Sequence, residues 1–599
     1  MPNFAVHQSV NWRLATLLVL AASVSVSRCH GQETADQRFQ KLADETWAFT
    51  MQEDPLWATS TGEHKYNDRL PQLTIADEKR RAARKQNFLD RAHAIATDQL
   101  SAKARTDLRI YVRLLENELA EFRFHSYLIP ISNRDGFHIN FPEVHRQMPF
   151  DTVEQFEHYI ARLGQFSRYA SQHIEMMREG IKTGSVLPSI VLERYREPIE
   201  VHIVEDATTS LMYAPLREIP DSISPDDQRR LGKAAKKAIL ESVVPGYRDF
   251  LRFMENEYVP VARGSIAASA LPEGREFYRH RVRKFTTLEI TPEEVHALGH
   301  REVQRIRREM QEIIDRIEFA GDFPAFLNYL RTDARFYAKT PDDLLKEVAL
   351  VLKRIDGQLP KLFGRLPRAP YGIRKIPEYI APTTTTAYYM PASGDGREAG
   401  FYYVNTYNLK SRPLYEVEAL SFHEAVPGHH LQISLQQEHE DLPLFRRHNG
   451  FTAFVEGWAL YAERLGLEAG FYEDPYSDFG RLTYEIWRAC RLVVDTGIHY
   501  LGWTRRQAIE FMKSHSALAE HNIRSEVDRY IAWPGQALAY KMGELKIREL
   551  RTFAEQELGN QFDVRAFHDA VLAGGSVPLD VLEDQIREFI SQAKQDSTP

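Results

Sequence analysis

"SFHEAVPGHHLQ" (residues 421–432) holds the residues on which the interpretation of the whole chain depends. The common zinc-peptidase helix reads H-E-x-x-H, with two histidines four residues apart and a glutamate beside the first. Here His423 and Glu424 match its start, but His429 and His430 come six and seven residues after His423. On a straight helix, residue 430 lies about 10.5 Å beyond residue 423, too far for both side chains to bind one ion.

A Pro-Gly pair separates the two halves of this motif. Pro427 cannot donate a hydrogen bond to the carbonyl of His423, and Gly428 tolerates unusual backbone angles. We therefore predict a helical bulge that brings His429 to the place of the second histidine and leaves His430 as the weaker candidate. The alternative is that these residues only cap a helix or line a solvated turn.

A third ligand is expected in "FTAFVEGWALYAERLGLE" (residues 451–468), which has a helical pattern. Glu456 lies among apolar residues, where a carboxylate needs a partner, and a bound cation would provide one. Glu463 is the second candidate, although its neighbours are more typical of a surface ion pair. Two histidines and a glutamate leave one position open, as in catalytic zinc sites. We predict His423, His429 and Glu456 as zinc ligands, with Glu424 as general base.

Three ordered motifs resemble the bacterial family of unknown function numbered 885 (DUF885): HEAVPGHHLQ, FVEGWALYAE and RYIAWPGQALAYKMGELKIREL. The resemblance covers most of residues 40–590. It implies a zincin-like metallopeptidase of the glutamate-ligand branch, with a mostly helical fold and a deep interior channel, similar to helical oligopeptidases and carboxypeptidases. The family motif reads H-E-x-x-P-G-H, so the resemblance also favours His429 over His430.

Helical patterns dominate the chain. Residues 291–317 predict a helix that begins with Thr291 as cap and Glu294 at the capping-box position. Residues 151–182 predict another helix, with Asp151 as its cap. The strongest strand signal is in residues 383–409, where two β-branched or aromatic runs flank a Gly-, Asp- and Ser-rich turn, which predicts a β-hairpin.

These patterns predict one fold class: a mostly α, two-lobed, zincin-like body with a small hairpin or sheet beside the metal helix. Pro-rich residues 359–381 mark a connection between the lobes. We predict a single domain over residues 32–599, with its active-site part at about 380–550.

The first 31 residues predict an export signal. Arg13 precedes the apolar run LATLLVLAASVSV, which is shorter than the about 20 residues of a membrane span. A short buried helix or a membrane anchor is the alternative, and Cys29 raises the possibility of a lipoprotein, although Arg28 before it fits lipid attachment poorly. Cleavage near Gly31 would leave Cys490 as the only cysteine. We expect a periplasmic or extracellular protein that is not membrane-bound after cleavage.

Other chemistries have weaker support. A formal charge of -8 does not favour nucleic-acid binding, and neither a G-x-S-x-G nucleophile elbow nor a phosphate-binding P-loop is present. His296 and His300 are four residues apart, as two metal ligands on one helix would be, but no glutamate follows His296 directly.

Five further residues are candidates for substrate contacts. Tyr540 could stabilise an oxyanion, and His499 could donate a hydrogen bond to a peptide carbonyl. Arg488, Arg491 or Lys541 could hold a terminal carboxylate. The alternative for each is packing in the core or a structural ion pair.

The sequence thus predicts an exported, zinc-dependent hydrolase that cleaves short peptides, either as an oligopeptidase or as a carboxypeptidase. Because the motifs indicate amide hydrolysis more firmly than a peptide substrate, an amidase for small N-acyl amino acids is one alternative. The other is a non-catalytic helical binding or scaffold protein with a structural or vestigial metal site.

Overall fold

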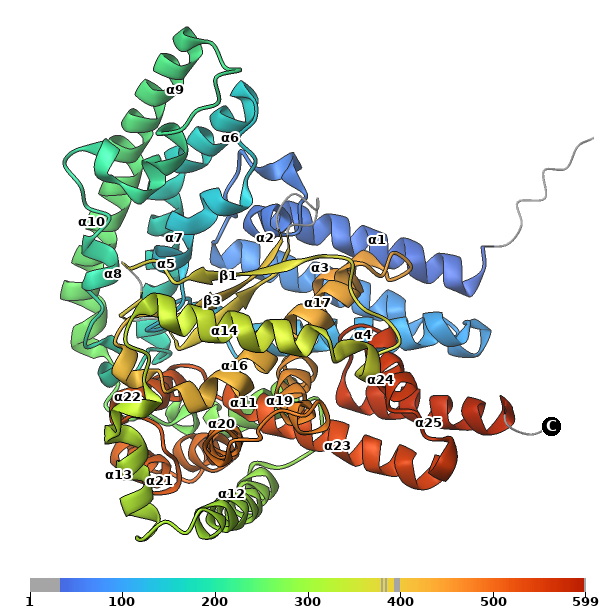
Figure 1. Cartoon of the computed structure of the whole chain (residues 1–599). Helices are drawn as coiled ribbons and strands as arrows, with labels where there is room; N and C mark the ends of the chain where they lie inside the picture. The colour runs from blue at the N-terminus through green and yellow to red at the C-terminus, as the bar shows by residue number, and fades with distance from the viewer. Residues whose placement is uncertain (1–32, 379–380, 383–384, 393–398, 597–599) are drawn as a thin grey trace, which may run out of the picture.

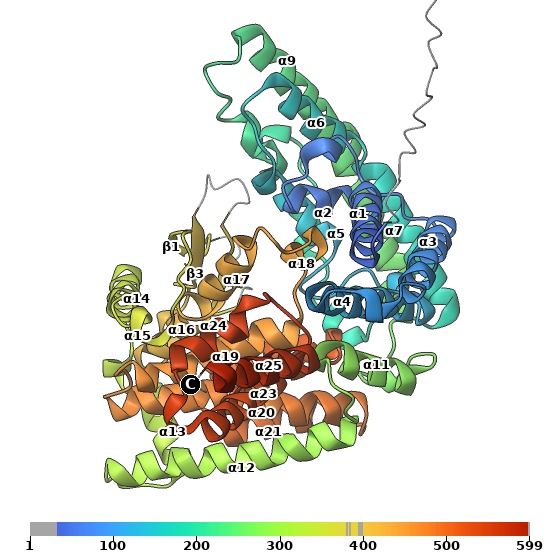
Figure 2. The same ribbon diagram turned by 90° about the vertical axis from the view of Figure 1, so that its right-hand side faces the viewer.

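The computed structural model describes residues 33–378, 381–382, 385–392 and 399–596. The predicted export signal and the predicted hairpin turn, residues 393–398, lie outside these ranges. Helices α1–α10 form one part of the molecule, the N-terminal lobe, and α11–α25 with the sheet form the other, the C-terminal lobe (Figure 2). One contiguous cluster of buried hydrophobic side chains runs through both lobes. Among the described helices, none has the length and apolar character to cross a membrane.

The N-terminal lobe consists of helices joined by turns, loops and short 3-10 helices (Figure 1). Its helices are α1 (Ala35–Glu53), α2 (Pro55–Ser60), α3 (Ile75–His93), α4 (Ala102–Arg123), α5 (Phe137–Asn140), α6 (Val153–Gly164), α7 (Phe166–Thr183), α8 (Glu197–Glu200), α9 (Pro225–Ala238) and α10 (Val244–Phe253).

The C-terminal lobe contains the sheet and the remaining helices. Before the sheet come α11 (Gly274–Thr286), α12 (Pro292–Arg316), α13 (Phe323–Thr332), α14 (Pro341–Asp356) and α15 (Leu359–Leu362). After it come α16 (Val417–Glu424), α17 (His429–Gln437), α18 (Leu444–His448), α19 (Thr452–Glu468), α20 (Pro475–His499), α21 (Arg505–His515), α22 (Glu520–Ala532), α23 (Ala539–Leu558), α24 (Val564–Ala573) and α25 (Leu579–Asp596).

One small sheet has the strand order β1-β3-β2. Strands β2 (Ala387–Met390) and β3 (Gly400–Val404) pair antiparallel, which confirms the two strands of the predicted hairpin. Strand β1 (Tyr371–Lys375) pairs parallel with β3 and was not predicted, because it lies within the Pro-rich connection. Since β3 is central, β2 is an edge strand of the sheet.

The two detailed helix predictions had different outcomes. Helix α12 is confirmed, with Thr291 and Glu294 forming the capping box. The single helix predicted over residues 151–182 is wrong, because the chain forms two helices, α6 and α7, that meet at Gln165. Its predicted cap is also wrong: Thr152, not Asp151, accepts the hydrogen bond from the Gln155 amide.

Helices α19 and α23 approach each other closely through two glycines. A Cβ atom on Gly457 would lie 2.5 Å from the Cα atom of Gly543. A Cβ atom on Gly543 would lie 1.8 Å from the carbonyl oxygen of Ala453. Only glycine allows this contact, which explains the glycines in the EGW and KMGE segments. The contact brings Tyr540, in the first turn of α23, close to Glu456 on α19.

Candidate metal centre

The Pro-Gly pair divides the metal-motif segment into two helices. Helix α16 ends at Glu424 and α17 begins at His429, so the predicted bulge within one helix is in fact a complete break. A Cβ atom on Gly428 would lie 2.1 Å from the carbonyl oxygen of His423, which leaves room only for glycine. The indole of Trp458 donates a hydrogen bond of 2.9 Å to the carbonyl of Pro427 and so fixes the break to α19.

The break brings His423 and His429 to the same point, opposite Glu456 of α19. The ligand atoms of these three residues all lie within 4.8 Å of one another. The Glu456 Oε2 atom is 3.5 Å from Nε2 of His423 and 3.4 Å from Nε2 of His429. Both distances are longer than an ordinary hydrogen bond. Ligands bound to a tetrahedral zinc at 2.0–2.1 Å lie about 3.3–3.4 Å apart, so the distances from Glu456 to the two histidines suit a zinc ion.

A buried carboxylate orients the first histidine. The Oε1 atom of Glu463 lies 2.8 Å from Nδ1 of His423, which leaves Nε2 of the ring pointing toward Glu456. Glu463 is only 1% exposed, so the surface ion pair expected for it is wrong. A carboxylate behind a ligating histidine is a usual feature of zinc sites. The signal was in the sequence: Glu463 follows Glu456 by seven residues, two helical turns, and therefore shares its face of α19.

His430 points away from the three convergent residues. Its Nδ1 atom is 2.9 Å from the hydroxyl of Tyr389, and its Nε2 atom is 3.1 Å from the carbonyl of Ala369. Both ring nitrogens are therefore engaged at the sheet. Of the two adjacent histidines, the structure brings His429 to the cluster and not His430.

The cluster is electrostatically arranged to receive a cation. Burial alone would raise the pKa of Glu456, but the neighbouring His423 and His429 outweigh it and hold the pKa well below its usual range. Burial alone would lower the pKa of His423, but Glu456 and Glu463 raise it to about 9. The carboxylates thus favour positive charge at this point, and a divalent cation would supply it in place of protons.

Glu424 and Tyr540 line the same cavity as the three convergent residues, a space of about 380 Å³. Burial raises the pKa of the Glu424 carboxyl, and its side chain makes no hydrogen bond with any described residue. The Tyr540 ring lies nearly parallel to that of His423, with centroids 6.5 Å apart. Burial raises the pKa of Tyr540, so its phenol stays protonated at neutral pH.

Arg488 and Arg491 also line this cavity, on the side of α20. The Nη2 atom of Arg488 lies 3.7 Å from Oε1 of Glu463. Arg491 donates to the Tyr530 hydroxyl at 2.9 Å and stacks over the Tyr540 ring. The Nε atom of Arg488 and the Nη1 atom of Arg491 are buried without a hydrogen-bond partner among the described residues.

Two predicted site residues lie elsewhere. His499 is wholly buried. Its Nδ1 atom accepts a hydrogen bond from the Ala268 amide, and its Nε2 atom lies 2.9 Å from the Tyr530 carbonyl. No ring nitrogen is therefore left for a substrate. The ammonium of Lys541 is also wholly buried and lies 2.8 Å from Glu485 and 2.8 Å from Glu544. Its predicted carboxylate-binding role is therefore wrong. Both residues stabilise helix packing.

The alternative metal-binding pair, His296 and His300, has no third ligand beside it among the described residues. The Nε2 atoms of His296 and His300 lie 3.2 Å apart, and Nδ1 of His296 lies 2.8 Å from the Thr496 hydroxyl. Within the described part of the chain, only His423, His429 and Glu456 form a group of three convergent ligands.

The edge strand of the sheet forms one wall of the cavity. Residues 385–389, which include most of β2, lie along it. Of the two hairpin strands, β2 and not β3 lines the cavity, because β3 is covered on both sides by its neighbouring strands.

The model of the family described as "Bacterial protein of unknown function (DUF885)" matches residues 55–586. No curated protein matches the chain. A crystal structure described as that of a "putative lipoprotein from Colwellia psychrerythraea" is 27% identical and aligns over 94% of this chain and 100% of that chain, with a TM-score of 0.88.

A second solved structure, described as that of a "putative lipoprotein of unknown function from Shewanella oneidensis", is 20% identical and aligns over 93% of this chain and 100% of that chain, with a TM-score of 0.67. At this identity the similarity shows the fold alone. Both neighbours share the mostly helical architecture along nearly the whole chain.

Proposed function

We propose that this chain, which belongs to the DUF885 family, is an exported, zinc-dependent peptidase of the zincin-like type that cleaves short peptides. One observation carries the proposal: two histidines and a glutamate whose ligand atoms converge share a cavity with a second glutamate, Glu424, that makes no hydrogen bond with any described residue. A structural zinc site has four protein ligands and no use for a general base, whereas a catalytic site has three and needs one. Export is supported by the 27% identical protein from Colwellia psychrerythraea, which is described as a "putative lipoprotein".

In this proposal His423, His429 and Glu456 hold the metal. When bound there, zinc supplies Lewis-acid chemistry, which polarises a carbonyl group and makes water more acidic. Glu463 keeps His423 in the orientation that presents Nε2, through the contact of 2.8 Å at Nδ1. Trp458 holds the break between α16 and α17 and so keeps His429 next to His423.

Glu424 moves the proton. Its carboxylate accepts a proton from the attacking water and transfers it to the leaving amine as the peptide bond breaks. The burial that raises its pKa makes this carboxylate a stronger base than an exposed glutamate. Its lack of a hydrogen-bond partner among the described residues leaves both oxygens available for this task.

Tyr540 donates a hydrogen bond to the oxygen that becomes negative in the tetrahedral intermediate. Its phenol lines the cavity and remains protonated, as an oxyanion donor must. The guanidinium of Arg491 over its ring, 4.2 Å from the centroid, holds the ring in place and makes the hydroxyl a better donor.

The cavity walls fit an extended peptide. The free edge of β2 can pair with a substrate backbone as an added strand, which gives affinity without strong side-chain selection. Arg488 and Arg491, which line the cavity, can hold a terminal carboxylate. The proposal therefore favours cleavage near the C-terminus of short unfolded peptides.

The test combines metal analysis with peptide digestion. Purified protein should contain about one zinc per chain, and a peptide library should be cleaved by that protein but not after chelation, as measured by mass spectrometry. C-terminal amidation of a cleaved decapeptide should reduce its turnover. Protein that binds zinc and cleaves no peptide or N-acyl amino acid would point to the non-catalytic alternative.

A further inference from the structure

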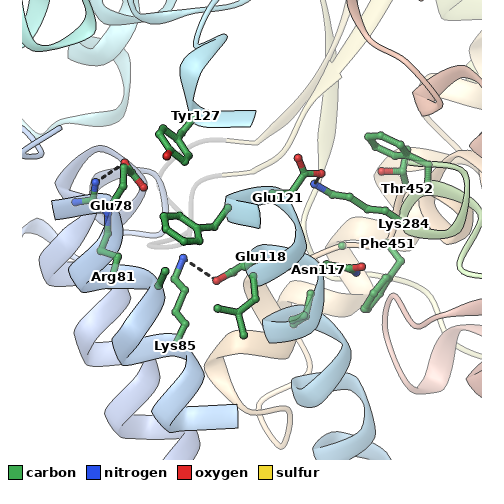
Figure 3. Close-up of a pocket in the computed structure, with 16 residues that line it drawn as sticks. Glu78, Arg81, Lys85, Asn117, Glu118, Glu121, Tyr127, Lys284, Phe451 and Thr452 are labelled. Carbon is green, nitrogen blue, oxygen red and sulfur yellow. Dashed lines mark hydrogen bonds and ion pairs between the residues drawn. The ribbon is translucent and has the colours of Figure 1, made fainter. Parts of the chain in front are cut away.

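A second cavity, of about 390 Å³, lies where the two lobes meet (Figure 3). Its walls come from α3 and α4 of the N-terminal lobe, and from α11 and the start of α19 in the C-terminal lobe. It is therefore built from segments that are far apart in the sequence. Nothing in the proposed chemistry at the metal centre uses it.

The charged groups of this cavity neutralise one another. Lys85 pairs with Glu118 at 2.8 Å, and Lys284 pairs with Glu121 at 2.6 Å. Arg81 pairs with Glu78 on the same helix (Figure 3). With three basic and three acidic side chains in its lining, the cavity favours neither an anion nor a cation.

Neutral polar groups in the same lining are unused. The side chains of Asn117, Tyr127 and Thr452 make no hydrogen bond with any described residue, and they lie around the cavity in Figure 3. Leu114 and Phe122 add apolar surface to the lining. Neutral donors and acceptors together with apolar surface suit an uncharged side chain and the peptide groups beside it.

Helix α19 connects this cavity to the metal centre. Thr452 lines the junction cavity, and Glu456, four residues later, is a proposed metal ligand. Residues four apart share one face of a helix and are separated by about 6 Å along its axis. An extended peptide advances about 3.3 Å per residue, so the cavity begins roughly two residues from the metal centre.

The proposed cleavage gives the direction of the substrate. Because the proposed peptidase cleaves near the C-terminus, substrate residues two or more positions from the cleaved bond lie on its N-terminal side. The junction cavity begins about one helical turn of α19 from Glu456, so these N-terminal residues are the ones that can enter it.

We propose that the junction cavity binds the substrate residues about two to four positions on the N-terminal side of the cleaved bond, and that it selects uncharged aromatic or aliphatic side chains there. This inference rests on the proposed peptidase function. It adds a specificity site, formed by both lobes, to the metal centre.

The test fills the cavity and compares long with short peptides. Leu114→Trp places a larger side chain in the space, and Asn117→Ala removes the amide. Glu116→Ala is the matched control, because Glu116 lies on the same helix α4, is exposed and does not line the cavity. The substrates are an octapeptide with phenylalanine on the N-terminal side of the cleaved bond and the tripeptide that shares its C-terminal residues.

We expect the ratio of kcat/KM for the octapeptide to kcat/KM for the tripeptide to fall about tenfold in Leu114→Trp, mainly through KM, which corresponds to the loss of one apolar side-chain contact. Asn117→Ala should lower the ratio less, and Glu116→Ala should stay within about twofold of the parent protein. An unchanged ratio in both cavity variants, with circular dichroism showing that they fold, would overturn the proposal.

Binding separates this inference from the proposed function. If the parent protein cleaves no peptide, the peptidase proposal fails, and calorimetric titration with the octapeptide then decides about the cavity. Weaker binding to Leu114→Trp than to Glu116→Ala would support a peptide site at the junction. Equal binding to both, or no binding to the parent protein, would exclude it.

Discussion

Replacement of Glu463 tests whether the buried carboxylate tunes the metal centre. Its contact of 2.8 Å with Nδ1 of His423 is screened little by solvent, because the two residues are 1% and 3% exposed. Loss of such a partner behind a ligating histidine typically weakens metal binding about 10–100-fold, or about 1.4–2.8 kcal/mol. Glu463→Gln keeps an acceptor and loses only the charge, so we expect the lower value. Glu463→Ala loses both and should reach the upper value.

The measurement is a zinc affinity from competition with a chromophoric chelator at constant pH. Glu468→Gln is the matched control, because Glu468 lies on the same helix but forms a solvent-exposed ion pair with Arg551. Its zinc affinity should stay within about twofold of the parent protein. Circular dichroism establishes that each variant is folded at the assay temperature.

Glu463→Ala should also be less stable without metal. Removal of one partner of a buried ion pair typically costs about 3–5 kcal/mol, since Arg488 would stay buried without its carboxylate. A folded Glu463→Ala protein with the zinc affinity of the parent would refute the reasoning, because His423 would then need no orienting partner.

Three further outcomes follow from the geometry. Glu424→Gln should keep its zinc in metal analysis but lose about 10²–10⁴-fold in peptide turnover, because it removes a proton carrier and not a ligand; parent-like turnover would move the base elsewhere. His429→Ala should lose zinc and His430→Ala should retain it, since His430 is held by Tyr389 and the sheet; equal retention would contradict the assignment. Gly543→Ala should lower the free energy of unfolding in urea by about 1–3 kcal/mol or more, because its Cβ atom would meet a backbone carbonyl at 1.8 Å; unchanged stability would show that α19 and α23 can separate.

The metal-ligand prediction depended on local information that a sequence carries well. The spacing of His423 and His429 excludes a straight helix, and Pro427 and Gly428 supply the means to break one. The structure brings together the two histidines and Glu456 selected on this basis. The form of the break was not predictable, because it depends on the Trp458 indole, which arrives from a separate helix.

The small sheet shows a different limit. Strands β2 and β3 carry strong β-branched and aromatic runs, and a hairpin is a local pairing, so their sequence sufficed. Strand β1, "YGIRK", contains a glycine and two basic or polar positions and pairs parallel with a strand that begins at Gly400. A short strand whose partner is distant in the sequence is identified by tertiary pairing and not by its own propensity.

The errors at Glu463, His499 and Lys541 have one physical cause. A helical pattern places these residues on a face but does not say which other helices cover that face. Lys541 is surrounded by three carboxylates from three helices, of which only Glu544 lies on its own. Its side chain therefore neutralises a buried cluster, whereas Arg488 and Arg491, one turn apart on α20, reach the cavity. A positive charge in the sequence does not show whether a side chain neutralises a buried cluster or lines the cavity. That depends on how many carboxylates distant segments bring to each cation.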